Sequence, residues 1–288
     1  MTGMPTIAQL LRAGAAELGA CSDSPRLDAE LLLGKILSCG RASLVVHGEA
    51  SVAAVDERAF RALLHGRRGG MPVAYLTGCR EFWSLRLAVT PAVLVPRPET
   101  ELLVEAVLAR LPVDRPRRVL DLGTGSGAIA LAIASERPQA QVTATDVCPQ
   151  ALRVARANAA ALGLHGIVWR RGSWFDAVPG EQYQVVVANP PYVAAADPAI
   201  ARLAAEPLLA LTPGPSGLEA LERIAADAGG HLTDDGVLAL EHGGSQAGAV
   251  AAMLAAHGFR RILSLRDQAG LPRVALGFFS ASTQRMTT

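Results

Sequence analysis

The sequence predicts an α/β protein: a seven-stranded, mostly parallel sheet preceded by a small helical domain and a β-hairpin. Three observations support this fold class. From Arg117 onward, short apolar runs alternate with helical patterns, which is typical of a parallel sheet with helices on both faces. Residues from Thr6 to about Gly70 instead show apolar side chains at helical spacing. Between these regions, residues 81–95 alternate partly in polarity and are interrupted by Pro91, a pattern that fits a hairpin.

The composition indicates a globular chain with no marked charge. Its 288 residues suffice for two domains with sizeable cores. Lys and Arg number 27 against 26 Asp and Glu, which argues against a nucleic-acid-binding surface, because phosphate binding usually needs a basic face. The four cysteines are scattered, so we expect no metal site and no disulfide framework. Neither a basic leader nor an apolar run near ~20 residues is seen, which predicts a cytoplasmic protein.

The predicted N-terminal helical domain covers residues 1–80 and carries no catalytic constellation of its own. Ser24 followed by Pro25 predicts a helix start, with a capping hydroxyl and proline at the first helical position. A third helix is expected over about residues 52–67. The hairpin, residues 81–96, is predicted to link this domain to a catalytic domain over residues 97–288.

The catalytic domain is predicted to begin with the polar segment 96–101, followed by a helix over about residues 101–111. This segment is either a helix cap or a rim that a substrate touches, which makes Arg97 and Glu99 candidate substrate contacts. The predicted strands cover residues 119–121, 141–146, 167–170, 185–188, 237–241, 262–265 and 274–278. The predicted helices between them cover residues 128–135, 149–162, 218–229 and 246–257. Residues 194–215 are weakly patterned, and we expect a mobile loop there.

The tetrapeptide Asn189-Pro190-Pro191-Tyr192 ends the apolar run 185–188. Two prolines cannot continue a central strand, so the chain leaves the sheet at a carboxyl end, where open α/β sheets build their sites. Asn189 offers a carbonyl acceptor, the prolines offer carbonyls without competing donors, and Tyr192 offers an aromatic face. This set suits a planar substrate with an NH2 group. The tetrapeptide alone fits a proline-punctuated loop equally well.

A glycine-rich loop, Asp121-Leu122-Gly123-Thr124-Gly125-Ser126-Gly127, follows the first predicted strand of the sheet. The glycines allow a tight turn and close approach of a ligand to the backbone. The pattern overlaps the dinucleotide-binding fingerprint. A carboxylate at Asp121, however, would repel a pyrophosphate and suits the cationic amino-acid end of S-adenosylmethionine. Asp146 ends the next strand, where it can accept both hydroxyls of a ribose, whether the cofactor is a dinucleotide or S-adenosylmethionine. A methyl donor beside the tetrapeptide predicts an N-methyltransferase.

These motifs resemble those of class I methyltransferases that modify planar nitrogens. Nearly the whole chain is similar to one family, the HemK-type methyltransferases that modify a glutamine in peptide chain release factors. The stretches that carry this similarity are residues 24–30, 72–78, 81–83, 96–101 and 240–243. The resemblance implies a Rossmann-like methyltransferase sheet, S-adenosylmethionine as cofactor and no metal. It also implies methylation of the side-chain nitrogen (N5) of the glutamine in a Gly-Gly-Gln motif. Release factors would be the partners of a monomer that binds neither nucleic acid nor membrane stably.

The resemblance also implies roles for individual residues. Asn189, Pro190 and Tyr192 would be catalytic, and the same residues with Pro191, Arg97 and Glu99 would contact the substrate. The cofactor would be bound by Asp121, Gly123, Thr124, Gly125, Ser126, Gly127, Asp146, Trp174 and Asn189, with Trp174 against the adenosine. Two positions depart from the family pattern. Ser173 stands where an acidic residue is frequent, and Arg202-Leu203 stands where Asp-Val often precedes the Glu-Pro pair.

Two alternatives remain open on the sequence alone. A nucleic-acid N-methyltransferase, acting on rRNA guanine or DNA adenine, would use the same tetrapeptide. The near-neutral charge and the missing base-reading domain count against it. A catalytically silent protein that binds release factors is the second alternative. The intact tetrapeptide and glycine-rich loop count against that one.

Overall fold

A computed structural model describes residues 4–280 of the chain and divides it into two compact units. The first unit takes in the chain up to Cys79 together with Arg202–Ala205, and the second takes in the rest. Each unit has its own buried apolar core. The outer ends of the two predicted domains, residues 1–3 and 281–288, lie outside the described residues.

The first unit is helical. Its helices are α1 (Ile7–Leu18), α2 (Pro25–Ile36), α3 (Arg41–Val46), α4 (Ala54–Arg68) and α5 (Val73–Thr77). The short helices α3 and α5 were not predicted. The predicted hydroxyl cap at Ser24 is wrong, because the Ser24 side chain makes no capping hydrogen bond. Its backbone N–H donates instead to the Ser22 hydroxyl at 3.1 Å, which in turn donates to Asp28 at 2.8 Å.

A hairpin of β1 (Cys79–Phe82) and β2 (Leu85–Ala88) follows the helices, and all of its residues except Cys79 belong to the second unit. The predicted hairpin exists, but its turn lies at Trp83 and Ser84 rather than at Pro91. Both turn residues have positive φ, 52° and 58°, as a two-residue type I′ turn requires. Glu101 accepts the Trp83 backbone N–H at 2.8 Å, which stabilises a conformation that these residue types seldom adopt.

A sheet of seven strands forms the centre of the second unit, as far as residues 4–280 show. The strands are β3 (Arg118–Leu122), β4 (Gln141–Asp146), β5 (Val168–Arg171), β6 (Tyr183–Ala188), β7 (Leu232–Glu241), β8 (Arg260–Arg266) and β9 (Pro272–Phe278). Their order is β5-β4-β3-β6-β7-β9-β8, and only β9 runs antiparallel to its neighbours. The predicted fold class is therefore confirmed. The largest shift in a boundary is at β7, which begins at Leu232 rather than Val237.

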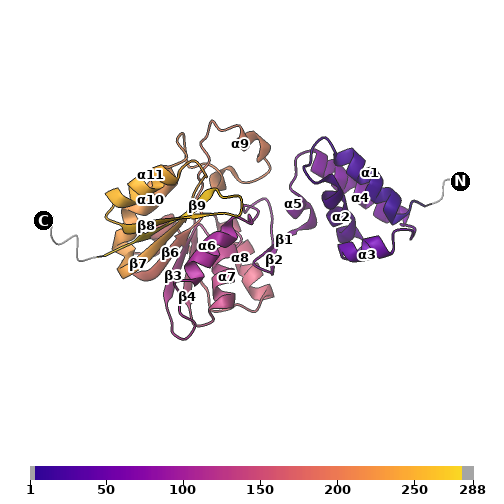
Figure 1. Ribbon diagram of the computed structural model, residues 1–288. Helices are drawn as coiled ribbons and strands as arrows, with labels where there is room; N and C mark the ends of the chain where they lie inside the picture. The colour runs from indigo at the N-terminus through magenta and orange to yellow at the C-terminus, as the bar shows by residue number, and fades with distance from the viewer. Residues whose placement is uncertain (1–3, 281–288) are drawn as a thin grey trace. The chain divides into compact units, whose positions relative to one another are not determined.

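Helices cover both faces of this sheet (Figure 1). They are α6 (Thr100–Leu108), α7 (Ala128–Glu136), α8 (Pro149–Ala161), α10 (Glu219–Ala228) and α11 (Ala247–Ala256). Along β6, Val185 and Val187 pack into the core shared with α6 and α7, whereas Val186 and Ala188 pack into the core shared with α10 and α11. Successive side chains of a strand point to opposite faces, so a strand covered on both faces is apolar throughout.

The segment 194–215 contains α9 (Ala199–Arg202) and the short 3-10 helix η2 (Leu208–Ala210). Backbone hydrogen bonds tie its two ends together: Val193 donates to Leu211, and Ala195 donates to Gly214, both at 3.0 Å.

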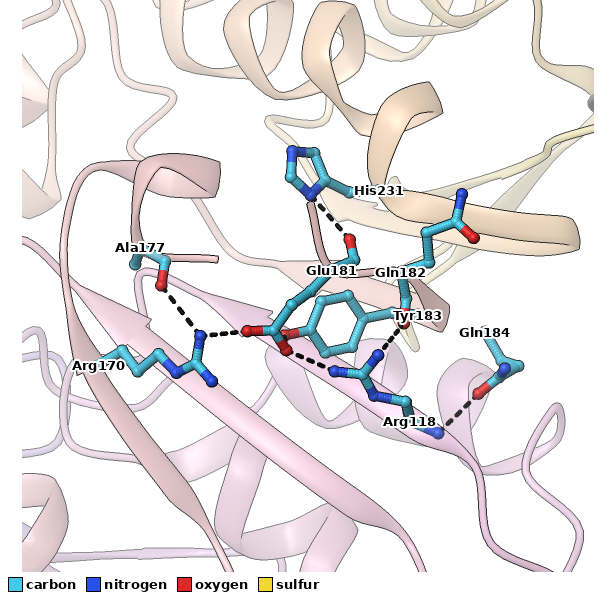
Figure 2. A network of polar contacts seen from close by, with 8 residues as sticks. All are labelled: Arg118, Arg170, Ala177, Glu181, Gln182, Tyr183, Gln184 and His231. Atoms are coloured by element: carbon cyan, nitrogen blue, oxygen red, sulfur yellow. Dashed lines mark hydrogen bonds and ion pairs between the residues drawn. The ribbon is translucent and has the colours of Figure 1, made fainter. Parts of the chain in front are cut away.

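A polar network joins β3, β5 and β6 near the point where β3 and β6 begin (Figure 2). Glu181 accepts hydrogen bonds from the guanidinium groups of Arg118 and Arg170. The Tyr183 hydroxyl donates to the same carboxylate at 3.1 Å, and the Arg118 guanidinium lies 4.6 Å from the centre of the Tyr183 ring. This network joins Arg170 of β5 to the start of β3 and to the segment before β6. None of the residues drawn lies at the carboxyl ends of β3, β4 and β6, where a site can form.

The order of the strands determines where that site lies. From β3 the chain moves outward to β4 and β5, and then returns to the other side of β3 as β6. Leu122 and Ala188 are paired at the ends of β3 and β6, so the loops starting at Gly123 and Asn189 diverge from neighbouring positions. Open α/β sheets bind ligands at such a switch point.

Candidate active site

A cavity of about 470 Å³ lies within the second unit, at the carboxyl ends of β3, β4 and β6. The predicted site residues in its wall are Arg97, Gly123, Thr124, Gly125, Ser126, Asp146, Trp174, Asn189 and Pro191. Thr100 and the unusual Ser173 also line it. The structure does not bring Glu99, Asp121, Gly127, Pro190 or Tyr192 to the wall.

The glycine-rich loop forms one side of the cavity. Gly125 has a φ of 57° and would carry a Cβ into open space, with no atom within 4 Å. Only its backbone conformation requires glycine. At Gly123, with a φ of 71°, a Cβ would lie 3.4 Å from the Trp174 ring. The absence of side chains here therefore exposes the backbone of the loop to a ligand beside an aromatic ring.

Asp146 is the last residue of β4 and lies beside this loop. Its Oδ2 accepts the Gly125 N–H at 2.9 Å and its Oδ1 accepts the Cys148 N–H at 2.8 Å. Burial raises the pKa of Asp146, and these backbone hydrogen bonds oppose the rise. Each carboxylate oxygen can accept a further hydrogen bond. Asp146 can thus support the loop and still accept hydroxyl groups from a ligand in the cavity.

Asp121 lies beneath the loop rather than on the ligand side. It is fully buried and paired in the sheet with both Ala144 and Val187. Its Oδ2 accepts the Thr124 hydroxyl at 2.6 Å, while its Oδ1 has no hydrogen-bond partner among the residues described. Burial raises the pKa of Asp121 to about 7. Its position inside β3, before the turn begins, keeps it out of the cavity wall.

Asn189 reaches the cavity with its amide orientation defined by a hydrogen bond. Its Nδ2 donates to the Thr100 hydroxyl oxygen at 3.0 Å. No residue of the described chain donates to its Oδ1. An amide held by its NH2 group presents its carbonyl oxygen as a free acceptor.

Tyr192 turns away from the cavity. Its ring packs against the core shared with α10 and α11, and its hydroxyl donates to Glu241 at 3.2 Å. Its backbone carbonyl accepts the Gln246 side-chain N–H at 3.0 Å. These contacts anchor the loop after β6, and the predicted aromatic wall is provided by Trp174 instead. His242 is buried beside Glu241, and burial lowers its pKa.

Three buried polar side chains shape the site without having been assigned a role from the sequence. Glu206 accepts the Val95 N–H at 3.0 Å and also binds the Arg97 guanidinium, which holds Arg97 at the wall. Glu241 lies at the end of β7, level with Asn189. In the sequence, Glu241 could have been noticed as a carboxylate at the end of the predicted apolar strand 237–241.

Asn158, the third of these residues, lies on α8 and is 2% exposed. Its Nδ2 donates to the carbonyls of Ser126 and Ala88, at 2.9 and 3.0 Å, and its Oδ1 accepts the Ala88 N–H at 2.7 Å. It therefore ties the glycine-rich loop to β2. In the sequence, Asn158 could have been noticed as a single polar side chain on the apolar face of an alanine-rich helix.

Comparisons with known proteins match this chain nearly end to end. A model of the PrmC N-terminal domain matches residues 9–78, and a model of the methyltransferase small domain matches residues 98–216. A release factor glutamine methyltransferase of Xylella fastidiosa (strain Temecula1) is 49% identical over 254 residues, which cover 88% of this chain and 92% of that protein. The chain belongs to the release factor glutamine methyltransferase family. The family member of Escherichia coli K12 is 44% identical over 269 residues, covering 93% of this chain and 96% of its own. The resemblance drawn from the sequence motifs is thus confirmed.

Solved structures at lower identity show the same fold. A methyltransferase of Pyrococcus furiosus superposes with a TM-score of 0.52 at 20% identity, covering 68% of this chain and 88% of its own. A 16S rRNA methyltransferase of T. thermophilus, solved with S-adenosylmethionine and guanosine, gives a TM-score of 0.52 at 19% identity. The match covers 70% of this chain and 49% of that one. Within residues 4–280, no helix is long and apolar enough to cross a membrane.

Proposed function

We propose that this family member transfers a methyl group from S-adenosylmethionine to N5 of the glutamine in the Gly-Gly-Gln motif of peptide chain release factors. The observation that carries the proposal is a single cavity lined by both the glycine-rich loop with Asp146 and the free carbonyl oxygen of Asn189. Relatives that are 44–49% identical over nearly their whole length carry the name of this activity.

The residues of the cavity fit S-adenosylmethionine. Asp146 retains acceptor capacity for ribose hydroxyls, and Trp174 lies against Gly123, where it would pack on the adenosine. The backbone of Gly123–Ser126 is open to the amino-acid end. Asp121 would contribute to binding of the amino-acid end only indirectly, because it accepts the Thr124 hydroxyl and so holds the loop that contacts the ligand. When bound, the cofactor would supply an electrophilic methyl group: the S–CH3 bond breaks as the N–CH3 bond forms, the sulfur leaves as a neutral thioether, and the amide nitrogen releases one proton to solvent.

The protein's own task is then to orient a poor nucleophile. The lone pair of an amide nitrogen is delocalised into the carbonyl group. In our proposal the Asn189 Oδ1 accepts one N–H bond of the glutamine amide and helps to turn its lone pair toward the methyl group. Pro190 is buried and outside the cavity wall, so the acceptance of the second N–H bond by its carbonyl stays a prediction. Alignment of this kind contributes roughly 7–11 kcal/mol in well-oriented systems.

The remaining predicted residues take more limited roles in this proposal. Tyr192 anchors the tetrapeptide through Glu241 rather than packing on the substrate. Arg97 is the wall residue best placed to contact the protein substrate, because Glu206 holds it there. Glu99 is exposed and outside the wall, and its contact with substrate stays a prediction. So do the monomeric state and the cytoplasmic location.

The test of the proposal is methyl transfer from labelled S-adenosylmethionine to purified release factor, tRNA, rRNA and DNA in parallel. Transfer to the release factor alone, lost when its Gly-Gly-Gln glutamine is replaced, is the expected result. Transfer to a nucleic acid instead would favour the alternative enzyme. Binding of release factor without transfer would favour the silent binding protein.

The cofactor assignment has a separate test in Asp146→Ala. Loss of hydrogen bonds to a charged acceptor should weaken S-adenosylmethionine binding by about 1.5–3 kcal/mol. Titration calorimetry measures this directly. Asp146→Asn is the matched control, because it keeps one acceptor oxygen and should lose less. Unchanged affinity in Asp146→Ala would show that Asp146 does not bind the cofactor.

A further inference from the structure

Two neighbouring leucines are largely exposed beside the cavity. Leu208 is 60% exposed and Leu209 is 64% exposed, whereas the next most exposed leucine of residues 4–280, Leu271, is 46% exposed. Leu209 also lines the cavity, so it lies where the cavity opens to solvent. Single exposed apolar side chains are common on soluble proteins, but adjacent ones beside a binding cavity are typical of a contact surface. We call residues 207–210 the apolar rim.

Hydrogen bonds hold the apolar rim in this exposed position. The Ala210 N–H donates to the Pro207 carbonyl at 2.9 Å, and the Leu211 N–H donates to the Leu208 carbonyl at 3.0 Å. Leu211 itself is 4% exposed and anchors the segment to the protein. The two exposed leucines therefore stand on an ordered turn, so a partner that covers them would have little main-chain freedom to remove.

Glu206, the residue before the apolar rim, joins it to a second stretch of the cavity wall. Glu206 is 5% exposed, accepts the Val95 N–H at 3.0 Å and binds the Arg97 guanidinium. Leu94 and Pro96, on either side of Val95, also line the cavity. Apart from Arg97, the wall on both sides of this junction is therefore apolar.

A glutamine whose amide reaches Asn189 must enter the cavity by its side chain. Because that side chain is short, the main chain on either side of the glutamine has to lie across the opening of the cavity. We propose that the apolar rim is a docking surface for the release-factor segment that flanks the Gly-Gly-Gln glutamine, with Leu208 and Leu209 as its main contacts. The two glycines favour such packing, because a main chain without side chains can approach closely. This inference rests on the proposed function, which supplies the partner.

The experiment measures binding of release factor in the presence of S-adenosylhomocysteine, so that no methyl transfer takes place. Titration calorimetry compares the full-length wild type with Leu208→Ser, Leu209→Ser and the double variant. Each single change should weaken binding roughly 10-fold, which corresponds to about 1.4 kcal/mol, and the double change should weaken it further. Leu209→Met keeps an apolar side chain and should bind nearly as well as the wild type. Val113→Ser is the control, because Val113 is 67% exposed and outside the cavity wall.

Kinetics on two substrates provide the second readout. In Leu208→Ser and Leu209→Ser, KM for whole release factor should rise while kcat changes little. KM for a short Gly-Gly-Gln peptide should rise by a similar factor, because the apolar rim would contact residues next to the glutamine. The affinity for S-adenosylmethionine should stay unchanged. An equal loss of cofactor affinity in Leu209→Ser would overturn the docking role of Leu209, because its side chain would then contact the cofactor.

The outcomes separate this inference from the proposed function. Equal binding and equal KM in the wild type and the double variant would overturn the docking surface even if methylation is intact. Binding that is weakened in the serine variants and kept in Leu209→Met and Val113→Ser would support the docking surface. If that wild type nevertheless methylates no release factor, the proposed function falls and the docking surface stands. If the double variant is unstable in urea unfolding, the single variants decide.

Discussion

At the position of Asn189, one side chain must be held firmly and still leave an acceptor free. The amide meets both demands because its two ends have different hydrogen-bonding roles. The NH2 group is held by Thr100 on α6, while the carbonyl oxygen faces the cavity. A carboxylate at the same position would lack the donor that Thr100 binds. The residue type is thus explained by the local contacts together with the proposed chemistry.

Asn189→Ala should slow the chemical step far more than it weakens cofactor binding. The lost hydrogen bond strengthens only as the lone pair of the substrate turns toward the methyl group. We expect single-turnover methylation of release factor to fall by 10²-fold or more, equivalent to roughly 2.7–4 kcal/mol. Cofactor titration on the same variant is the control and should show a modest change. A rate within a few-fold of the wild type would refute the assignment.

At the scale of elements, the glycine-rich loop is held from outside as well as by its own turn. Asp146 on β4 binds the Gly125 N–H, and Asn158 on α8 binds the Ser126 carbonyl. Asn158 also binds both backbone groups of Ala88 on β2. One side chain thus connects a helix, the hairpin and the loop.

Asn158→Ala should destabilise the fold and loosen the loop together. It leaves buried backbone groups of Ala88 and Ser126 without partners, and each such loss costs about 1–3 kcal/mol. Urea unfolding measures the free energy of unfolding. Calorimetry measures the affinity for S-adenosylmethionine, which should fall if the glycine-rich loop is less ordered. Arg153→Ala, an exposed change on the same helix, is the control and should shift stability by less than about 0.5 kcal/mol. Equal effects of the two variants would contradict the role of Asn158.

At the scale of the whole molecule, two buried carboxyl groups should make stability depend on pH in an unusual direction. Burial raises the pKa of Glu241 from 4.5 to about 7 and that of Asp121 from 3.8 to about 7. A group whose pKa is raised by folding stabilises the protein below its unfolded value. This contribution is lost as the pH rises through the folded value. Both groups should therefore reduce the free energy of unfolding between about pH 4 and 7.

Glu241→Gln tests this expectation. Between pH 5 and 8 the variant should lose less unfolding free energy than the wild type, by roughly 2–3 kcal/mol, since each pKa unit corresponds to about 1.4 kcal/mol. Urea unfolding at the two pH values gives the difference. Glu105→Gln, an equal change of charge at an exposed site on α6, should leave it unaltered. If the unfolding free energy of Glu241→Gln depends on pH in the same way as that of the wild type, Glu241 has the same pKa in the folded and in the unfolded chain.

The helical unit has its own core, which leads us to propose that it recognises the protein substrate. Its buried side chains, among them Leu11, Leu33 and Phe60, pack with one another. Removing residues 1–78 should leave cofactor affinity unchanged, because every residue of the cavity wall lies in the other unit. Turnover on whole release factor should fall by roughly 10²-fold, the advantage of a second linked binding surface. Turnover on a Gly-Gly-Gln peptide should fall little, and equal losses on both substrates would disprove the idea.

Local sequence patterns were enough to predict the elements of the sheet and the loops that line the cavity. The apolar run 185–188, the prolines after it and the glycines from Gly123 to Gly127 act through backbone sterics and burial within a few residues. The strands and the helices of the sheet could therefore be predicted, with the predicted helix ends within three residues of those observed. The turn at Trp83 could not, because its positive φ is stabilised by Glu101, which is distant in sequence.

Only the tertiary structure decided which of the nominated residues face the cavity. Asp121 and Asp146 both end apolar strands in sequence, yet the sheet buries the first beneath the loop and leaves the second in the wall. Tyr192 turns toward Glu241 for the same kind of reason, since the order of the strands places β7 beside β6. The hydrogen bonds from Asn189 to Thr100 and from Tyr192 to Glu241 each join segments that are distant in sequence. Such contacts depend on strand order and register, which no pattern along the chain encodes.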